Sequence, residues 1–442
     1  VQAQDGIRDP ESCLVGSEMC IRDRPMSDFF QNVIITTLHD LSRRPTEALQ
    51  QDLQQFAPRR PMSLVLPCLY SELQHPALSG ILDQLQEVPY LSQIVIGLDR
   101  ASESEYRHAL EYFSRLPQPH AVLWNDGPRM RVIQDRLAEL ELAPQELGKG
   151  CNVWYCFGYV QATGVAEAVA LHDCDITTYH RDMLGRLLYP VANPQFNYQF
   201  CKGYYARVAE NRLNGRVSRL LVSPLIRTLK KVSGEHPFLS YLDSFRYPLA
   251  GEFSMRMEVL KDLRIPSDWG LEIGVLSEVY RNYSTNRLCQ VEIADTYDHK
   301  HQDLSAADDT RGLSRMSLDI SKSLFRKLAT YGAVFDQATV RSVKAAYFRI
   351  ALDLIESYSN DALMNGLHLD RHHEEQAVEL FARNILKAGE SFLEGGDESP
   401  FIPAWNRVTS VYQDVFADLV AAVEADTREF GPPSARGQAV SG

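Results

Sequence analysis

The chain has 442 residues, of which 45% are hydrophobic and 23% are charged, and its formal net charge at pH 7 is −13. This is the composition of an ordinary globular protein, and the length predicts two domains or one large domain with an appendage. The acidic charge argues against a nucleic-acid partner, which would favour a basic surface. No apolar run approaches the ~18 residues of a membrane-spanning helix, so we expect no membrane insertion.

Eight cysteines are scattered along the chain without a CxxC pair. This pattern favours reduced, buried thiols over a disulfide framework or a zinc site, and it predicts a cytoplasmic protein. Residues 1–25 show no helical or strand period and lack the apolar core of a signal peptide. We expect them to be a disordered, non-native leader, and Met26 to be the native start.

A helical segment is expected over residues 26–60, because apolar side chains recur at helical spacing from Phe29 to Phe56. Pro45 divides this segment into two short helices. Four apolar strands separated by helices follow, at Met62–Pro67, Gln93–Leu98, Ala121–Asp126 and Ala166–Asp175. Continuous apolar strands of this kind predict a parallel sheet with helices on both faces. Ligands bind such sheets beyond the carboxyl ends of the strands.

The pattern between residues 196 and 302 is mixed. Strands are predicted at Phe196–Val208 and Leu288–Ala294, and helices at Met255–Leu263 and Gly270–Asn282. From residue 304 to residue 430 every pattern is helical, and the polar tail 431–442 is expected to be disordered. The sequence therefore predicts an α/β fold over residues 61–303 and an all-helical C-terminal region.

The stretch LHDCDITTYH carries the first candidate for chemistry, because an apolar strand runs directly into Asp173 and Asp175. Residues two apart in an extended segment point the same way. Two such carboxylates suit a hard cation such as Mg²⁺ or Mn²⁺, which fills the rest of its shell with phosphate oxygens and water. The alternative interpretation is a polar turn at the end of a strand.

Three further segments carry candidate ligands, each with a structural alternative. Lys149, in GKG before a helix, can reach a diphosphate or be an exposed linker lysine. Arg216 and Ser218, in NGRVSR, can bind phosphate and carboxylate or lie in a solvated loop. His299 and His301, in DHKH, can ligate a divalent ion or lie on the surface.

Acidic residues at strand and helix ends complete the candidates. Glu72 ends LPCLYSE, where it can accept a hydrogen bond from a base or a ribose. Glu272 falls in the first turn of an apolar helix for which Asp268 is a suitable N-cap. The run DRHHEE, residues 370–375, is expected to be a solvated helix start. GxGxxG and GxxxxGK[ST] are both absent, so the chain resembles neither a dinucleotide fold nor a P-loop.

Taken in order, LPCLYSE, GKG, DCD, GRVS, PLAGEF, DWGLEIGVLSE and HKH resemble the glucosyl-3-phosphoglycerate synthase family of retaining GT-A glycosyltransferases. The resemblance covers about residues 62–302, and PLAGE with the GLEIG text is its specific part. It implies a Rossmann-like GT-A domain and a metal-dependent transfer of glucose from a nucleoside-diphosphate glucose to the 2-hydroxyl of 3-phosphoglycerate. The product would be glucosyl-3-phosphoglycerate, a precursor of the compatible solute glucosylglycerate.

The resemblance also implies roles for individual residues. Those that would hold the nucleotide sugar are Leu66, Glu72, Asp99, Lys149 and Asp173. Those that would bind the acceptor are Arg216, Ser218, Gly251 and Glu252. Asp175 and His299 would bind Mg²⁺ or Mn²⁺, and Asp175 and Glu272 would be catalytic, with Glu272 beneath the transferring sugar.

Three rival functions remain open. Another GT-A transferase would use a mannosyl donor or a glycerate-type acceptor. A sugar-nucleotide pyrophosphorylase would carry a glycine-rich loop after the first strand, which LPCLYSE lacks. A noncatalytic nucleotide-sugar-binding protein would bind the donor without turnover. For the helical C-terminal region we expect a role in covering the catalytic domain or in forming a homodimer.

Overall fold

A computed structural model of the chain describes residues 31, 34–41, 44–144, 148–266, 270–299, 312–395 and 401–432. The expected leader with its start at Met26, the candidates Asp268 and His301, and nearly all of the expected disordered tail lie outside these residues. The six described cysteines are free and buried, as expected. Within the described residues, no helix combines the length and the apolar character needed to cross a membrane.

The centre of the fold is an eight-stranded mixed sheet with the order β1-β10-β6-β9-β5-β2-β3-β4. The strands are β1 (Thr36–Leu38), β2 (Met62–Leu69), β3 (Leu91–Asp99), β4 (His120–Trp124), β5 (Ala168–Leu171), β6 (Phe200–Tyr205), β9 (Phe253–Arg256) and β10 (Leu288–Ala294). All neighbours are parallel except β9, which is antiparallel to β5 and β6. The carboxyl ends of the other strands therefore meet the amino end of β9 at one edge of the sheet.

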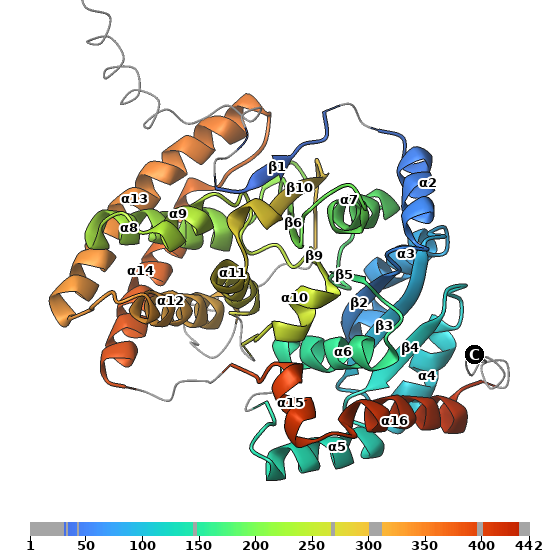
Figure 1. The fold of residues 1–442 in the computed structure, drawn as a ribbon. Coiled ribbons are helices and arrows are strands. Elements are labelled where there is room, and N and C mark those ends of the chain that lie inside the picture. Colours follow the sequence, from blue (N-terminus) through green and yellow to red (C-terminus); the bar gives the residue numbers. More distant parts are fainter. Residues whose placement is uncertain are drawn as a thin grey trace, which may run out of the picture.

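Helices cover both faces of this sheet, so its strands are apolar on both sides (Figure 1). On β2, Leu64 and Leu66 pack into the core on one face and Val65 into the core on the other. The first face is covered by α2 (Thr46–Phe56), α3 (Pro76–Leu85), α4 (Glu103–Phe113) and α7 (Arg181–Ala192). The second is covered by α5 (Pro128–Glu139), α6 (Lys149–Thr163), α8 (Ser223–Ser233), α9 (Pro237–Asp243), α10 (Met257–Asp262) and α11 (Leu271–Asn282). This mixed sheet with helices on both faces confirms the predicted α/β fold class.

The helical C-terminal region shares the core of the second face. It consists of α12 (Gly312–Thr330), α13 (Gln337–Met364), α14 (Arg371–Leu393), α15 (Trp405–Val411) and α16 (Val415–Phe430). Helix α13 packs on α8, and α14 packs on both α12 and α13, while α16 returns along α6 and α5 (Figure 1). Trp405 stacks on Trp154 of α6 with ring centroids 4.2 Å apart. Hydrophobic residues of the α/β part and of the helical part form one continuous core. The domain boundary expected near residue 303 therefore stays a prediction.

Two local predictions are wrong. The segment before Pro45 contains β1 rather than a helix, because its β-branched residues Ile35, Thr36 and Thr37 suit a strand and β10 offers a parallel edge. The helix expected from Met255 begins only at Met257, since Met255 ends inside β9. In both cases the pairing strand comes from a distant part of the sequence, which a local apolar pattern does not reveal.

Candidate active site

The two aspartates of DCD meet a histidine at the carboxyl edge of the sheet. Asp173 and Asp175 follow β5, and His299 follows β10. One ligand atom of each lies within 4.8 Å of the others. Their segments are joined by an antiparallel bridge between Ile176 and His299 and by a hydrogen bond from the Thr177 amide to the Asp298 carbonyl. The structure therefore brings these three side chains together at one edge of the sheet.

The donor set fits a divalent cation. Asp175 Oδ1 and His299 Nδ1 lie 3.7 Å apart, and within the described residues both atoms are buried without a hydrogen-bond partner. Unpaired buried polar atoms are costly, and an ion between them would satisfy both. Burial raises the pKa of Asp175, but the neighbouring His299 and Lys149 outweigh it and lower that pKa overall. Asp175 is therefore a carboxylate at neutral pH and a ready ligand.

Arg207 sets the orientation of the histidine. It follows β6, and its Nη1 donates to His299 Nε2 at 2.5 Å. Because a guanidinium only donates, Nε2 accepts, and Nδ1 of the neutral imidazole carries the ring proton on the side of Asp175. Arg207 also lies over the ring of Tyr297, with 5.6 Å between its guanidinium carbon and the ring centroid. These contacts fix the ring beside Asp175. A metal ion could bind Nδ1 only after Nδ1 had lost its proton, with Nε2 then protonated and the hydrogen bond from Arg207 broken.

Lys149 joins the DCD segment to α11. It is the first residue of α6, and its Nζ lies 2.7 Å from Asp173 Oδ1 and 3.2 Å from Glu272 Oε1. Burial opposes the charged amine, but the two carboxylates raise the pKa of Lys149 overall. Lys149 is thus a half-buried cation paired with two carboxylates, and not an exposed linker lysine. We call Asp173, Asp175, His299, Lys149 and Glu272 the carboxylate cluster.

The PLAGE segment packs directly on this cluster. A Cβ on Gly251 would lie 2.5 Å from Asp173 Oδ2, so only glycine leaves room for the carboxylate. Glu252 is fully buried and accepts a hydrogen bond of 2.7 Å from the Tyr297 hydroxyl. Burial and the charge of Asp173 raise the pKa of Glu252. The structure thus brings Gly251 and Glu252 next to the carboxylate cluster.

The residues expected at the nucleotide end are less closely grouped. Asp99 ends β3 and accepts a hydrogen bond of 2.7 Å from Asn125 Nδ2. Burial raises the pKa of Asp99 to about 6, against the effect of its asparagine partners. Glu72 is buried in the 3₁₀ turn η2 (Tyr70–Gln74), which follows β2. The side chain of Leu66 points into the core and not toward the site, so a donor contact there would have to come from its backbone.

Arg216 and Ser218 belong to a second group of polar side chains. They lie at the start of η3 (Val217–Val222), a π-helical turn that leads into α8. Glu374 of α14 accepts 2.8 Å hydrogen bonds from Arg216 Nε and Arg219 Nη1. Ser218 Oγ is buried and, within the described residues, has no hydrogen-bond partner. We call Arg216, Ser218, Arg219 and Glu374 the arginine cluster.

Arg207 connects the two clusters. Its carbonyl accepts a 2.7 Å hydrogen bond from the Asn214 amide, and its side chain packs under Gly215. Gly215 has a φ of +78°, and a Cβ there would lie 3.3 Å from Arg207 Cβ. The glycine therefore allows the turn before Arg216 to lie against the residue that holds His299. The arginine cluster and the carboxylate cluster are consequently neighbours at one edge of the sheet.

Comparison with known proteins identifies the family. No family model matches the chain. The glucosyl-3-phosphoglycerate synthase of Persephonella marina is 44% identical over 404 residues, which cover 91% of this chain and 100% of that protein. The chain belongs to the glucosyl-3-phosphoglycerate synthase family. The synthase of the same name from Methanococcoides burtonii is 40% identical over 408 residues, 91% of this chain and 99% of the relative. The family resemblance of the sequence motifs is thereby confirmed.

A solved structure of the family shows a more distant likeness. It is the glucosyl-3-phosphoglycerate synthase of Mycobacterium tuberculosis in complex with phosphoglyceric acid, with 19% identity and a TM-score of 0.48. The match covers 67% of this chain and 88% of that one.

Three polar residues of this synthase-family chain were not predicted from the sequence. Arg207 ends a predicted strand, and its place at the carboxyl edge was the available signal. Lys202 is a lone charge inside an apolar strand; it is buried and donates 2.5 Å to the Ala250 carbonyl of PLAGE. Glu374 was expected in a solvated helix start, but it is only 2% exposed. Its partners lie more than 150 residues away, so no local signal predicted its burial.

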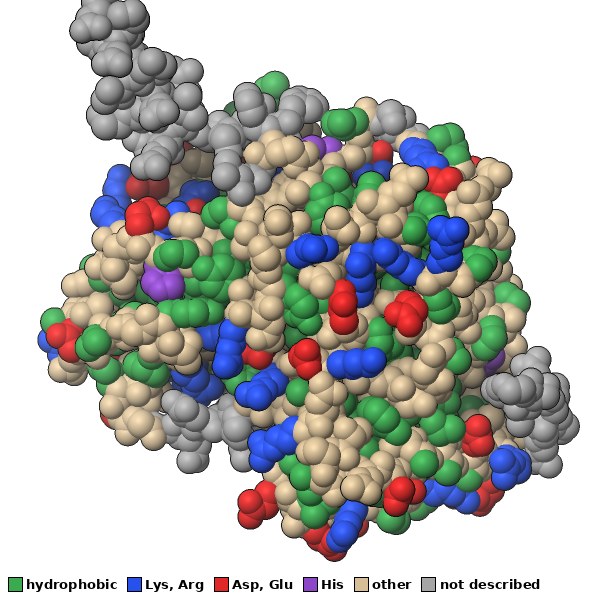
Figure 2. All heavy atoms as spheres, in the orientation of Figure 1, with side chains coloured by type: hydrophobic (Ala, Val, Ile, Leu, Met, Phe, Trp, Pro, Cys, Tyr) green, Lys and Arg blue, Asp and Glu red, His purple; other side chains and the backbone are tan. Residues whose placement is uncertain are grey.

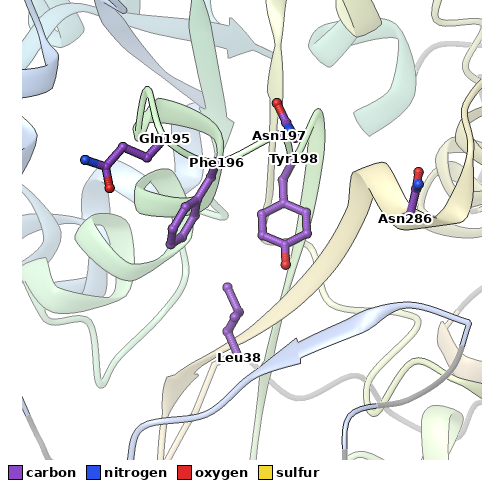
Figure 3. Close-up of a pocket in the computed structure, with 6 residues that line it drawn as sticks. All are labelled: Leu38, Gln195, Phe196, Asn197, Tyr198 and Asn286. Atoms are coloured by element: carbon purple, nitrogen blue, oxygen red, sulfur yellow. The ribbon is translucent and has the colours of Figure 1, made fainter.

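A cavity of about 290 Å³ lies elsewhere in the fold (Figure 3). Its lining residues are Leu38, Gln195, Phe196, Asn197, Tyr198 and Asn286. All but Leu38 lie in the segments that precede β6 and β10, whereas the two clusters follow the carboxyl ends of the strands. The cavity therefore does not belong to the site.

Charges of both signs share the surface of this synthase-family chain. On the face shown in Figure 2, Lys and Arg side chains lie among Asp, Glu and hydrophobic side chains. This face lacks the uniform basic area that nucleic-acid binding favours, in line with the acidic net charge.

Proposed function

We propose that this chain transfers glucose from a nucleoside-diphosphate glucose to the 2-hydroxyl of 3-phosphoglycerate, with retention at the anomeric carbon. The observation that carries the proposal is the pairing of the two clusters at one sheet edge in a member of this family. The carboxylate cluster has three carboxylates and one ammonium group, while the arginine cluster has two guanidinium groups and one carboxylate. The first suits a cation and the second suits an anion.

Asp173, Asp175 and His299 would hold the metal ion. With Mg²⁺ or Mn²⁺ held there, the site would supply positive charge that stabilises the departing nucleoside diphosphate. Arg207 keeps His299 beside Asp175 in the absence of metal. Metal binding at Nδ1 would require the ring proton at Nε2 and would release Arg207.

Lys149 and Glu272 would act on the donor's remaining groups. Lys149 is charged and lies at the amino end of α6, where both its ammonium group and the helix favour a diphosphate oxygen. Glu272 would accept hydrogen bonds from sugar hydroxyls beneath the transferring glucose. Glu252 and Gly251 would bound the same space on the side of β9.

Arg216 and Ser218 would orient the acceptor. The terminal nitrogens of Arg216 can bind a phosphate or a carboxylate bidentately, and Ser218 Oγ can donate to the same anion. In the transfer, the acceptor's 2-oxygen forms a bond to the anomeric carbon while the bond to the diphosphate oxygen breaks. The proton of the 2-hydroxyl passes to a phosphate oxygen of the donor. We assign no described side chain as a covalent nucleophile.

The test is a transfer assay with the chain starting at Met26. UDP-, GDP- and ADP-glucose are each incubated with 3-phosphoglycerate and Mg²⁺, with and without EDTA, and product is identified by mass spectrometry. We expect acceptor-dependent, EDTA-sensitive release of nucleoside diphosphate and formation of glucosyl-3-phosphoglycerate. Parallel arms contain GDP-mannose or glycerate. Faster turnover in either arm would overturn the assignment of donor or acceptor, and donor binding without turnover would favour a binding protein.

The cellular location and the oligomeric state are also proposals. The free, buried cysteines support a reducing, cytoplasmic location for the chain. A homodimer is expected, and light scattering after size-exclusion chromatography would measure the mass directly.

A further inference from the structure

The arginine cluster contains one residue from the helical C-terminal region. Glu374 lies in the first turn of α14 and is 2% exposed, and its two carboxylate oxygens contact different arginines. Oε1 accepts from Arg216 Nε and Oε2 accepts from Arg219 Nη1, both at 2.8 Å. A carboxylate shared in this way fixes both guanidinium groups in space.

The two arginines differ in what else they bind. Arg219 is 7% exposed and also donates from Nε to the Asn214 carbonyl at 2.7 Å and from Nη2 to the Leu213 carbonyl at 3.2 Å. It therefore supports the turn before Gly215. The side chain of Arg216 is 32% exposed, and within the described residues its two terminal nitrogens have no hydrogen-bond partner. Arg216 is thus held through Nε and presents its other N–H groups outward.

Helix α13 strengthens the same attachment. The Tyr347 hydroxyl donates to the Leu220 carbonyl of η3 at 2.5 Å, in a fully buried position. The guanidinium carbon of Arg219 lies 4.8 Å from the ring centroid of Tyr358. The turn that carries Arg216 and Ser218 is therefore held from two helices of the C-terminal region.

We propose that Glu374 is a positioning residue for the acceptor, and that the helical C-terminal region thereby completes the acceptor-binding site. Glu374 holds Arg216 by Nε, so that its two terminal nitrogens face the phosphate or carboxylate of 3-phosphoglycerate. This inference rests on the proposed function, because it takes Arg216 as the acceptor's ligand.

Charge and conformational entropy both support this role. Two guanidinium groups and one carboxylate leave one positive charge in the cluster without a partner among the described residues. That charge can meet the anionic acceptor, while Glu374 offsets the repulsion between the two neighbouring guanidinium groups. An arginine side chain has many rotamers, and fixing it before binding removes part of the entropy cost of binding.

The experiment compares Glu374→Gln with Glu375→Gln. Glu375 is the next residue on α14, but its side chain is 40% exposed and pairs with Arg371, so it is a matched control. For Glu374→Gln we expect the KM for the acceptor to rise at least tenfold while the KM for the donor changes less than twofold. Calorimetric titration of 3-phosphoglycerate into protein with UDP and Mg²⁺ should show the same loss of affinity. Glu375→Gln should match the parent chain in both measurements.

A second variant distinguishes a loss of acceptor binding from misfolding. Glu374→Gln leaves Arg219 buried without its carboxylate, so thermal unfolding of the variant is measured first. The double variant Arg219→Met with Glu374→Gln removes one buried charge of each sign but still releases Arg216. It should show the same increase in the KM for the acceptor. Glu374→Asp, which keeps the charge, should recover part of the acceptor affinity.

The failures of the two ideas are distinct. If the parent chain neither binds nor glucosylates 3-phosphoglycerate, the proposed function is wrong. If the parent chain is active and a folded Glu374→Gln variant has the same acceptor KM or a lower one, the positioning role is wrong. A lower acceptor KM would mean that Glu374 competes with the acceptor for Arg216. An equal rise in both KM values would also overturn it, because a general structural loss does not separate acceptor from donor.

Discussion

The carboxylate cluster and the arginine cluster are neighbours, yet they are assembled in different ways. The first uses residues that directly follow β5 and β10 or open α6 and α11, all within the α/β part of the chain. The second needs Glu374, which lies 158 residues beyond Arg216 in a separate helical region. A cation site can thus arise from the sheet edge alone, whereas the anion site depends on an added layer of helices. Variants of the two clusters should therefore have separable effects.

The largest effect is expected from loss of a metal ligand. Asp175→Ala removes a carboxylate from the ligand set with His299, and we expect turnover to fall by about 10³-fold or more, since metal catalysis is worth several kcal/mol. The measurements are kcat/KM and Mn²⁺ binding by electron paramagnetic resonance. Asp83→Asn, on the exposed surface of α3, is the control. Retention of more than a tenth of the activity with normal Mn²⁺ binding would contradict the assignment.

A smaller effect should follow from crowding the same cluster. In Gly251→Ala the new methyl group would lie 2.5 Å from Asp173 Oδ2, so the carboxylate or the loop must move. We expect activity to fall by about 10²-fold, as for a displacement of ~1 Å in a catalytic group. Acceptor binding, measured by calorimetry, should change far less than turnover, because the arginine cluster is untouched.

Gly80→Ala is the matched control for this substitution. Gly80 lies in α3, and a Cβ there meets no atom within 4 Å. The change should leave activity intact and stabilise the protein by up to about 1 kcal/mol, the difference in helix propensity between the two residues. If both variants lost activity equally, close packing on Asp173 would not be the cause.

The same contrast explains what the sequence could predict. Asp173, Asp175 and Lys149 were predictable because each follows or precedes a clear apolar element, and the ends of parallel strands meet at one edge. Leu288–Ala294 was predicted with its observed bounds for a similar reason: it is a mostly apolar segment, interrupted by Gln290 and Glu292, that ends at a polar turn. Local pattern is enough where neighbours in sequence are neighbours in space.

The residues that escaped prediction depend on distant contacts. β1 is a strand because β10 pairs with it, and β9 because it lies between β5 and β6. Glu374 resembles any acidic residue in the first turn of a helix, where the helix dipole alone would explain it. Only the packing of α14 on η3 buries it between two arginines. Family resemblance supplied Arg216, but it could not supply the residue that holds it.

Arg207 tests how independent the two clusters are. Arg207→Met should keep the packing of the side chain but lose the hydrogen bond to His299 Nε2, which favours the tautomer with a protonated Nδ1. We therefore expect metal affinity to rise by about 10-fold, the free energy of one hydrogen bond from a charged donor. The apparent activation constant for Mg²⁺ is the measurement, and Arg212→Met, on the exposed strand β8 (Arg212–Leu213), is the control. A higher acceptor KM with an unchanged Mg²⁺ constant would instead assign Arg207 to the arginine cluster.

The smallest effect on turnover is expected at Asp99, but it has a distinct dependence on pH. The pKa of Asp99 is raised from 3.8 to about 6, mainly by burial. Between these values the folded chain retains a proton that the unfolded chain has lost, so this group's contribution to stability is lost as pH rises from about 4 to about 6. The shift corresponds to about 3 kcal/mol at most.

Asp99→Asn removes this dependence. The free energy of unfolding of the variant minus that of the parent chain should therefore increase between pH 4 and pH 7. Denaturant unfolding of both chains at each pH measures this difference. Asp99 ends β3, and three strands separate β3 from β6, which leads to the arginine cluster. Any change in kinetics should therefore affect the donor KM and leave the acceptor KM unchanged. A difference in stability that stays constant with pH would show that the pKa of Asp99 is the same in the folded and unfolded chains, and the hydrogen bond from Asn125 would then offset the effect of burial. A shift confined to the acceptor would show that the two ends of the sheet edge are coupled.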